Sequence, residues 1–119
     1  MFRMHQGKVI AVGQEAIDEN EKILIFFGKG VTDGLRPYSV IQEIEQAEDI
    51  ELAVGGTILF GEQEYHITYV GHLANQNLQT IQHISFVFSE VPTDKLSSSV
   101  YLTPATLPAI TEGMTITYS

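Results

Sequence analysis

The sequence predicts an all-β domain: a small closed or partly open barrel or sandwich of roughly six to eight short strands, with one short helical crossover near residues 73–82. Three observations support this. Short apolar segments rich in β-branched and aromatic residues recur, two of them alternate with polar residues, and turns with glycine or proline separate them. With 119 residues and 44% hydrophobic residues, the chain has the size of one domain, so we expect residues 1–119 to fold as a single unit.

Three segments in the first half indicate strands. Lys22 to Phe27 is a run of aliphatic and aromatic residues that ends at Gly28, as expected for a buried strand followed by a turn. Tyr38 to Ile44 alternates in part. Thr57 to Phe60 lies between two glycine-containing turns, so it should open a hairpin.

The clearest alternation runs through residues 65–70. We expect its apolar face to lie in the core and its polar face to point away from it. The apolar face comprises Tyr65, Ile67 and Tyr69, and the polar face comprises His66 and Thr68.

A second alternation covers residues 83–88 and places His83 opposite the face formed by Ile84, Phe86 and Phe88. His83 should therefore be accessible. The polar segment 73–82, with Leu78 and Ile81 three residues apart, suits a short surface helix that connects the two alternating strands.

The last part of the chain is rich in turns. It holds three of the four prolines, and Met114 to Tyr118 alternates as an edge strand would. Exposed edge strands in a small sheet would allow a homodimer.

Composition excludes several functions. The chain has no cysteine, which rules out disulfides, thiolate metal sites and cysteine nucleophiles and suits a cytoplasmic protein. It has no apolar run near the length of about 18 residues that a membrane span needs, and its N-terminal segment lacks the apolar stretch of a secretory signal. A net charge of −9 with six scattered Lys and Arg argues against nucleic acid and favours a basic partner.

Familiar catalytic motifs are absent, including the phosphate-binding loop, the dinucleotide fingerprint, the serine elbow and the His-Glu-x-x-His zinc motif. Four histidines remain, at positions 5, 66, 72 and 83. A neutral imidazole is a good nucleophile towards phosphorus, so histidine chemistry is the strongest remaining prediction.

His83 is the first candidate, because it begins a strand after a polar turn and faces away from the apolar side chains. His66 could contact His83 if their strands were neighbours. A metal site built from His66, His72, His83 and Glu64 is the alternative, although the spacing of these residues is not diagnostic of any metal. The acidic residues between Glu43 and Glu51 suit a solvated loop better than paired catalytic acids.

One block of the sequence resembles a known family. Residues 61–88 read GEQEYHITYVGHLANQNLQTIQHISFVF, which is similar to the glucitol/sorbitol-specific IIA component of the bacterial phosphoenolpyruvate-dependent phosphotransferase system. The matching elements are Tyr65, Ile67-Thr68, Val70-Gly71, Ala74, Asn77-Leu78 and His83. The pair Phe26-Phe27 followed by Gly28 also suits the family.

The resemblance implies an enzyme of phosphoryl transfer: a phosphocarrier that accepts a phosphoryl group on histidine from HPr and passes it to IIB of a glucitol/sorbitol transporter. It implies no cofactor, and contact with the membrane only through the IIB and IIC components. His83 is the histidine that matches the family pattern and would be the nucleophile. His66 or Thr68 would orient its imidazole or bind the phosphoryl oxygens.

Gln42 departs from the family pattern. In enteric-type members the corresponding position holds a histidine that has been taken as an acceptor, whereas the amide of Gln42 cannot accept a phosphoryl group. This difference leaves two hypotheses. Either His83 is the acceptor in this chain, with Gln42 as a binding residue, or the chain is a regulatory or binding module that has lost phosphotransfer.

Overall fold

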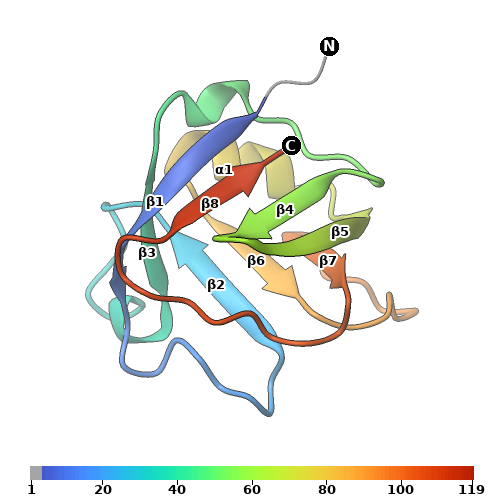
Figure 1. The fold of residues 1–119 in the computed structure, drawn as a ribbon, viewed down its shortest axis with the longest axis horizontal. Coiled ribbons are helices and arrows are strands. Elements are labelled where there is room, and N and C mark those ends of the chain that lie inside the picture. Colours follow the sequence, from blue (N-terminus) through green and yellow to red (C-terminus); the bar gives the residue numbers. More distant parts are fainter. Residues whose placement is uncertain (1–3) are drawn as a thin grey trace.

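Eight strands close into one barrel in the computed structural model, which describes residues 4–119 (Figure 1). The strands are β1 His5–Val12, β2 Ile23–Phe27, β3 Val40–Ile44, β4 Thr57–Phe60, β5 Gln63–Val70, β6 Ile84–Val87, β7 Ser99–Thr103 and β8 Thr115–Tyr118. Their order around the barrel is β1-β3-β2-β6-β7-β5-β4-β8. One helix, α1 Ala74–Ile81, and two single 3-10 turns, η1 Arg36–Tyr38 and η2 Ala47–Asp49, complete the described chain. The predicted all-β barrel with a short helical crossover is confirmed.

The strands that surround the crossover helix pair in a mixed pattern. β2 runs antiparallel to β6 and parallel to β3, while β6 runs parallel to β7. α1 connects β5 to β6 and packs against η2 and β6. The carboxyl end of α1 therefore meets the end of β2 and the beginning of β6, and this junction holds His83.

Aromatic side chains fill the barrel. Phe60 is fully buried and packs edge-to-face against Tyr65 and Phe86 at centroid distances of 5.4 and 5.3 Å, and Phe26 packs in the same way against Phe86 at 5.4 Å. Each such ring contributes about 1.5–3 kcal/mol by leaving water. The prediction that Tyr65, Phe86 and Phe88 lie in the core is confirmed.

Tyr69 does not follow that prediction. The pairing of β5 with β7 is irregular between Ile67 and Tyr69, where Thr68 is the extra residue. A bulge of this kind reverses the alternation, so Val70 packs against the core and Tyr69 turns outward. Its ring lies edge-on to Tyr101, with Lys95 over its face at 5.6 Å from the centroid.

The C-terminal strand is not an edge strand. β8 pairs with β1 on one side and with β4 on the other, so the barrel closes through it. The expectation that the C-terminal strand forms an exposed edge is therefore wrong.

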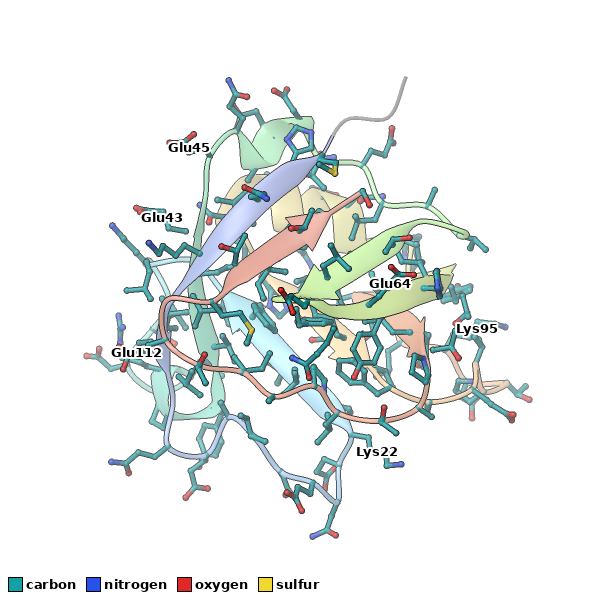
Figure 2. The ribbon with its side chains drawn as sticks, viewed as in Figure 1. Lys22, Glu43, Glu45, Glu64, Lys95 and Glu112 are labelled. Carbon is teal, nitrogen blue, oxygen red and sulfur yellow. The ribbon has the colours of Figure 1, made fainter. Side chains whose placement is uncertain are left out.

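Charged side chains point outward from the barrel in Figure 2, as the labelled Glu43, Glu45 and Glu64 show. The acidic residues between Glu43 and Glu51 are all exposed. Among residues 4–119, no helix is long and apolar enough to cross a membrane.

Candidate functional site

The site is centred on His83, which immediately precedes β6 and lies beside the end of β2. The antiparallel register of these strands places Ile84 opposite Phe26 and so brings His83 level with Phe27. The two rings stack at a centroid distance of 4.1 Å with an interplanar angle of 16°. Nδ1 of His83 lies 3.1 Å from the carbonyl oxygen of Phe26.

This hydrogen bond determines the tautomer of His83. A backbone carbonyl can only accept, so Nδ1 must carry the hydrogen and donate it to Phe26. In the neutral imidazole the lone pair is then on Nε2. The end of β2 thus holds the ring in the tautomer whose nucleophilic atom is Nε2.

Nε2 of His83 reaches solvent. Within residues 4–119, every buried side-chain nitrogen or oxygen has a hydrogen-bond partner. Nε2 has no such partner in this part of the chain, so it cannot be buried. The half-buried ring is therefore held on one side and open at the nitrogen that could react.

The segment before His83 is fastened to β2 and β3. The carbonyl of Ile81 accepts from the N–H of Gly28 at 3.2 Å, and the side-chain oxygen of Gln82 accepts from the N–H of Ile44 at 2.8 Å. Gln82 ends α1 in the left-handed region, with φ of 55°, which is unfavourable for a residue with a side chain. These bonds hold the turn that delivers His83 to the start of β6.

Gln42 lies inside the barrel next to this segment. It is fully buried, its Nε2 donates to the carbonyl of Gln82 at 3.2 Å, and its Oε1 accepts from the hydroxyl of Tyr118 at 2.5 Å. Burial raises the pKa of Tyr118 well above its ordinary value. Gln42 is thus part of a buried polar network and does not line the surface around His83.

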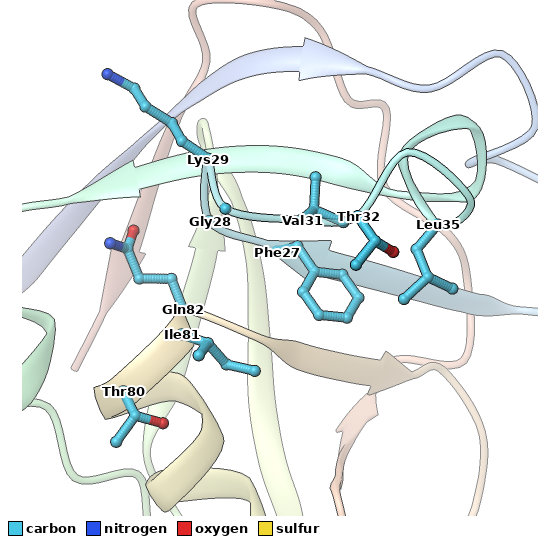
Figure 3. A pocket seen from close by; sticks show the side chains of 10 residues that line it. Phe27, Gly28, Lys29, Val31, Thr32, Leu35, Thr80, Ile81 and Gln82 are labelled. Atoms are coloured by element: carbon cyan, nitrogen blue, oxygen red, sulfur yellow. The ribbon is translucent and has the colours of Figure 1, made fainter.

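A pocket of about 450 Å³ opens beside Phe27, the stacking partner of His83 (Figure 3). Its walls come from the end of β2, the loop after that strand and the last turn of α1, and their apolar side chains include Phe27, Leu35 and Ile81. Leu35 and Ile81 are 46% and 54% exposed. Apolar side chains left this open beside a reactive group are a feature of surfaces that bind another protein.

The rim of this pocket carries charge. Nζ of Lys29 lies 2.6 Å from a carboxylate oxygen of Glu43, and both side chains are more than half exposed. An exposed pair of this kind contributes little to stability, so both groups can exchange their partner for one on a docking protein.

Comparison with known proteins decides the family. Residues 4–117 match the family described as PTS system glucitol/sorbitol-specific IIA component. The chain belongs to this family. A solved structure, the crystal structure of a PTS system IIA component from Enterococcus faecalis V583, is 43% identical and superposes with a TM-score of 0.93, covering 95% of this chain and 98% of the other. A search of curated proteins finds no significant match.

The resemblance drawn from residues 61–88 is therefore confirmed. The role of this IIA family is that of a phosphocarrier in a sugar-alcohol phosphotransferase system, and IIA components work with HPr and with IIB and IIC. Gln42, the residue that departs from the IIA pattern described above, places an amide inside the barrel.

The other predicted site residues of this IIA chain lie elsewhere. β7 separates β5 from β6, so the strands of His66 and His83 are not neighbours, and His66 instead pairs with Glu64, at 3.2 Å on the exposed face. Thr68 sits at the bulge and donates to the carbonyl of Tyr101. The hypothesis that His66 contacts His83 required their strands to be neighbours, and they are not. Among residues 4–119, no group of three or more His, Asp or Glu is placed to bind a metal ion.

Sequence reasoning missed the partners of His83. Phe27 had a signal, since Phe26-Phe27 with Gly28 belongs to the IIA resemblance, but its contact with His83 depends on the register of β2 against β6. Gln82 and Tyr118 gave no local signal, because their roles come from hydrogen bonds to Gln42, 40 and 76 residues away in sequence.

Proposed function

We propose that this IIA chain is an active phosphocarrier whose acceptor is Nε2 of His83. The observation that carries the proposal is the hydrogen bond from Nδ1 to the carbonyl of Phe26, which leaves the lone pair on an Nε2 that reaches solvent. A nucleophile held in one tautomer and one orientation needs no further activation to attack a phosphoryl group that is delivered in line.

The proposed reaction is a double transfer. The bond between phosphorus and its donor atom on HPr breaks as the bond between phosphorus and Nε2 of His83 forms, and the Nδ1 proton stays hydrogen-bonded to Phe26 while positive charge develops on the ring. In the second transfer the bond between phosphorus and Nε2 breaks, with IIB as acceptor. Positioning supplies the catalysis, and the reaction as proposed uses no metal or nucleotide.

HPr would dock over the pocket beside Phe27. Its walls include Phe27, Leu35 and Ile81, which suit an apolar side chain of a protein. The chain carries a net charge of −9, and Glu43 lies at the pocket rim, so basic groups on the partner would be attracted. We place the protein in the cytoplasm, where it would serve a glucitol/sorbitol transporter through IIB and IIC.

Phosphorylation in a reconstituted system tests this proposal. The purified protein is incubated with phosphoenolpyruvate, Enzyme I and HPr, and intact-mass analysis follows an acid-labile gain of one phosphoryl group. We expect the wild type and His66→Ala to gain the group and His83→Ala to remain unmodified. His66 is a matched control because it is exposed and lies on β5, away from the junction. Equal labelling of His83→Ala and wild type would contradict the assignment of the acceptor.

Gln42 supports a second candidate, a regulatory or binding module without phosphotransfer. The amide is fully buried and bonded at both ends, so it contributes no acceptor. Gln42→His discriminates between the candidates. Under this second candidate, wild type stays unlabelled while a control IIA in the same tube is labelled, and a phosphoryl gain appears only when the histidine is restored.

A further inference from the structure

A continuous chain of polar contacts leads from the barrel interior to His83. The hydroxyl of Tyr118 donates to Oε1 of Gln42, and Nε2 of Gln42 donates to the carbonyl of Gln82, whose peptide unit continues directly into His83. Tyr118 and Gln42 are both almost completely buried, at 1% and 0% exposure. The geometry therefore links the end of β8 and the middle of β3 to the residue that carries the proposed nucleophile.

The side-chain amide of Gln42 provides the two hydrogen bonds that its position in the barrel requires. The carbonyl of Gln82 needs a donor and the hydroxyl of Tyr118 needs an acceptor, and a primary amide supplies both on one short side chain. An apolar residue would leave two buried polar groups unsatisfied, which is costly in a low-dielectric interior. A carboxylate would repel the carbonyl of Gln82.

The carbonyl of Gln82 also controls the orientation of the His83 backbone. Gln82 is in the left-handed region, and the peptide plane between Gln82 and His83 is held on its N–H side by the bond from His83 to the carbonyl of Asn77 at 3.2 Å. The bond from Gln42 fixes one side of this plane, and the bond from Nδ1 of His83 to Phe26 fixes the ring on the other side. Loss of the bond from Gln42 would leave the carbonyl side of this plane unfixed and so loosen the alignment of the imidazole with Phe26.

We propose that Gln42 is a positioning residue for His83, acting through the carbonyl of Gln82 to keep the imidazole in the Nδ1–H tautomer with Nε2 outward. The expected consequence for phosphoryl transfer rests on the function proposed above, but the tautomer does not.

The test combines a spectroscopic and a kinetic readout on the full chain. Long-range ¹H–¹⁵N NMR reports which ring nitrogen of His83 carries hydrogen, and intact-mass time courses with HPr give kcat and KM. Gln42→Met removes both hydrogen-bonding atoms while keeping a side chain of similar length. Gln42→Glu, studied where its buried carboxyl is protonated, retains one donor and one acceptor and serves as the rescue variant. Gln79→Leu is the control, because Gln79 lies on α1, the helix that ends at Gln82, and its amide donates to the carbonyl of Ile50 instead.

We expect the wild type, Gln79→Leu and protonated Gln42→Glu to show Nδ1–H, and Gln42→Met to show a mixture of tautomers. Gln42→Met should also lower kcat by about tenfold or more with KM for HPr unchanged, since small misplacements of a reacting group have large effects on rate. An unchanged tautomer and rate in folded Gln42→Met would overturn the proposal. If that variant does not fold, Gln42→Glu decides: a tautomer that stays Nδ1–H after the glutamate has ionised, and can no longer donate to the carbonyl of Gln82, would overturn the proposal.

The outcomes separate this inference from the proposed function. No phosphoryl gain in the wild type, together with a tautomer that responds to Gln42→Met, would reject the phosphocarrier role and keep the positioning role. A wild-type His83 that carries its hydrogen on Nε2 would reject the positioning role directly.

Discussion

The imidazole of His83 lies 4.1 Å from the ring of Phe27, and the two planes are within 16° of parallel. This stack covers one face of the imidazole, while the bond to the Phe26 carbonyl holds its edge. Two successive residues at the end of β2 therefore restrain the proposed nucleophile in different ways, one through packing and the other through the tautomer.

The stack makes a first prediction. Phe27→Leu keeps an apolar side chain but loses the flat face, and aromatic pairs contribute about 0.5–1.5 kcal/mol beyond the area that they bury. We expect the rate of phosphoryl uptake from HPr to fall about 2- to 10-fold, measured by intact mass over time. Phe27→Tyr keeps the ring and should react like the wild type. Equal rates for the Leu and Tyr variants would show that the stack has no part in the reaction.

The pocket rim makes a second prediction. Ile81→Asp places a charge where we expect an apolar side chain of HPr to dock, so KM for HPr should rise at least about fivefold with little change in kcat. Leu96→Asp is the matched control, because Leu96 is also half exposed, does not line the pocket and receives the same added charge. A similar rise in KM for both variants would indicate general repulsion from HPr and would argue against docking at this pocket.

The buried hydroxyl of Tyr118 makes a third prediction, for stability at high pH. Burial raises the pKa of Tyr118 above its ordinary value of 10.0, so above that pH the unfolded chain loses this proton while the folded chain keeps it. The unfolded state then binds fewer protons, and the free energy of unfolding falls as pH rises, by up to about 1.4 kcal/mol per pH unit for one proton.

Urea unfolding between about pH 9 and pH 11, a range that spans the ordinary tyrosine pKa, checks this with Tyr118→Phe as the comparison. The two proteins share every other ionisable group, so the difference between the two slopes isolates Tyr118. We expect the wild type to lose stability more steeply than the variant. Parallel curves would mean that Tyr118 ionises as readily in the folded state as in the unfolded one.

Local patterns in the sequence were enough to predict most of the barrel. The apolar run before Gly28, the glycine-bounded strand before the β4–β5 turn and the alternation at residues 83–88 each depend on neighbours in sequence, and each is a strand in the structure. The bulge at Thr68 was not visible, since only pairing with β7 shows that one residue is extra. The prediction of an edge strand at β8 was wrong for the same reason, because closure depends on its distant partners β1 and β4.

The site was less predictable than the fold. His83 was selected by its strand position and its match to the family, but the bond to Phe26 joins residues 57 apart and the contact of Gln42 with Tyr118 joins residues 76 apart. Contacts of this kind are set by strand register and by the closure of the barrel. A sequence pattern read in short windows contains neither.

β2 approaches the carboxyl end of α1 closely at Gly28, and a final prediction concerns the replacement of this glycine. A Cβ added there would lie 3.1 Å from the carbonyl oxygen of Ile81 and 3.2 Å from Cβ of Gln82, both of which belong to the segment that delivers His83. Gly28→Ala should therefore push this segment outward, lower the free energy of unfolding by about 1–3 kcal/mol and slow phosphoryl uptake.

Gly30→Ala is a close control for that variant. Gly30 lines the same pocket, has no atom within 4 Å of an added Cβ and is not among the glycines with positive φ. Alanine there should leave uptake unchanged and stabilise the fold by up to about 1 kcal/mol, because it restricts the unfolded chain. Urea unfolding and the HPr time course measure both effects. If Gly28→Ala matched Gly30→Ala in both, the close contact between β2 and the turn before His83 would not be needed to hold the site.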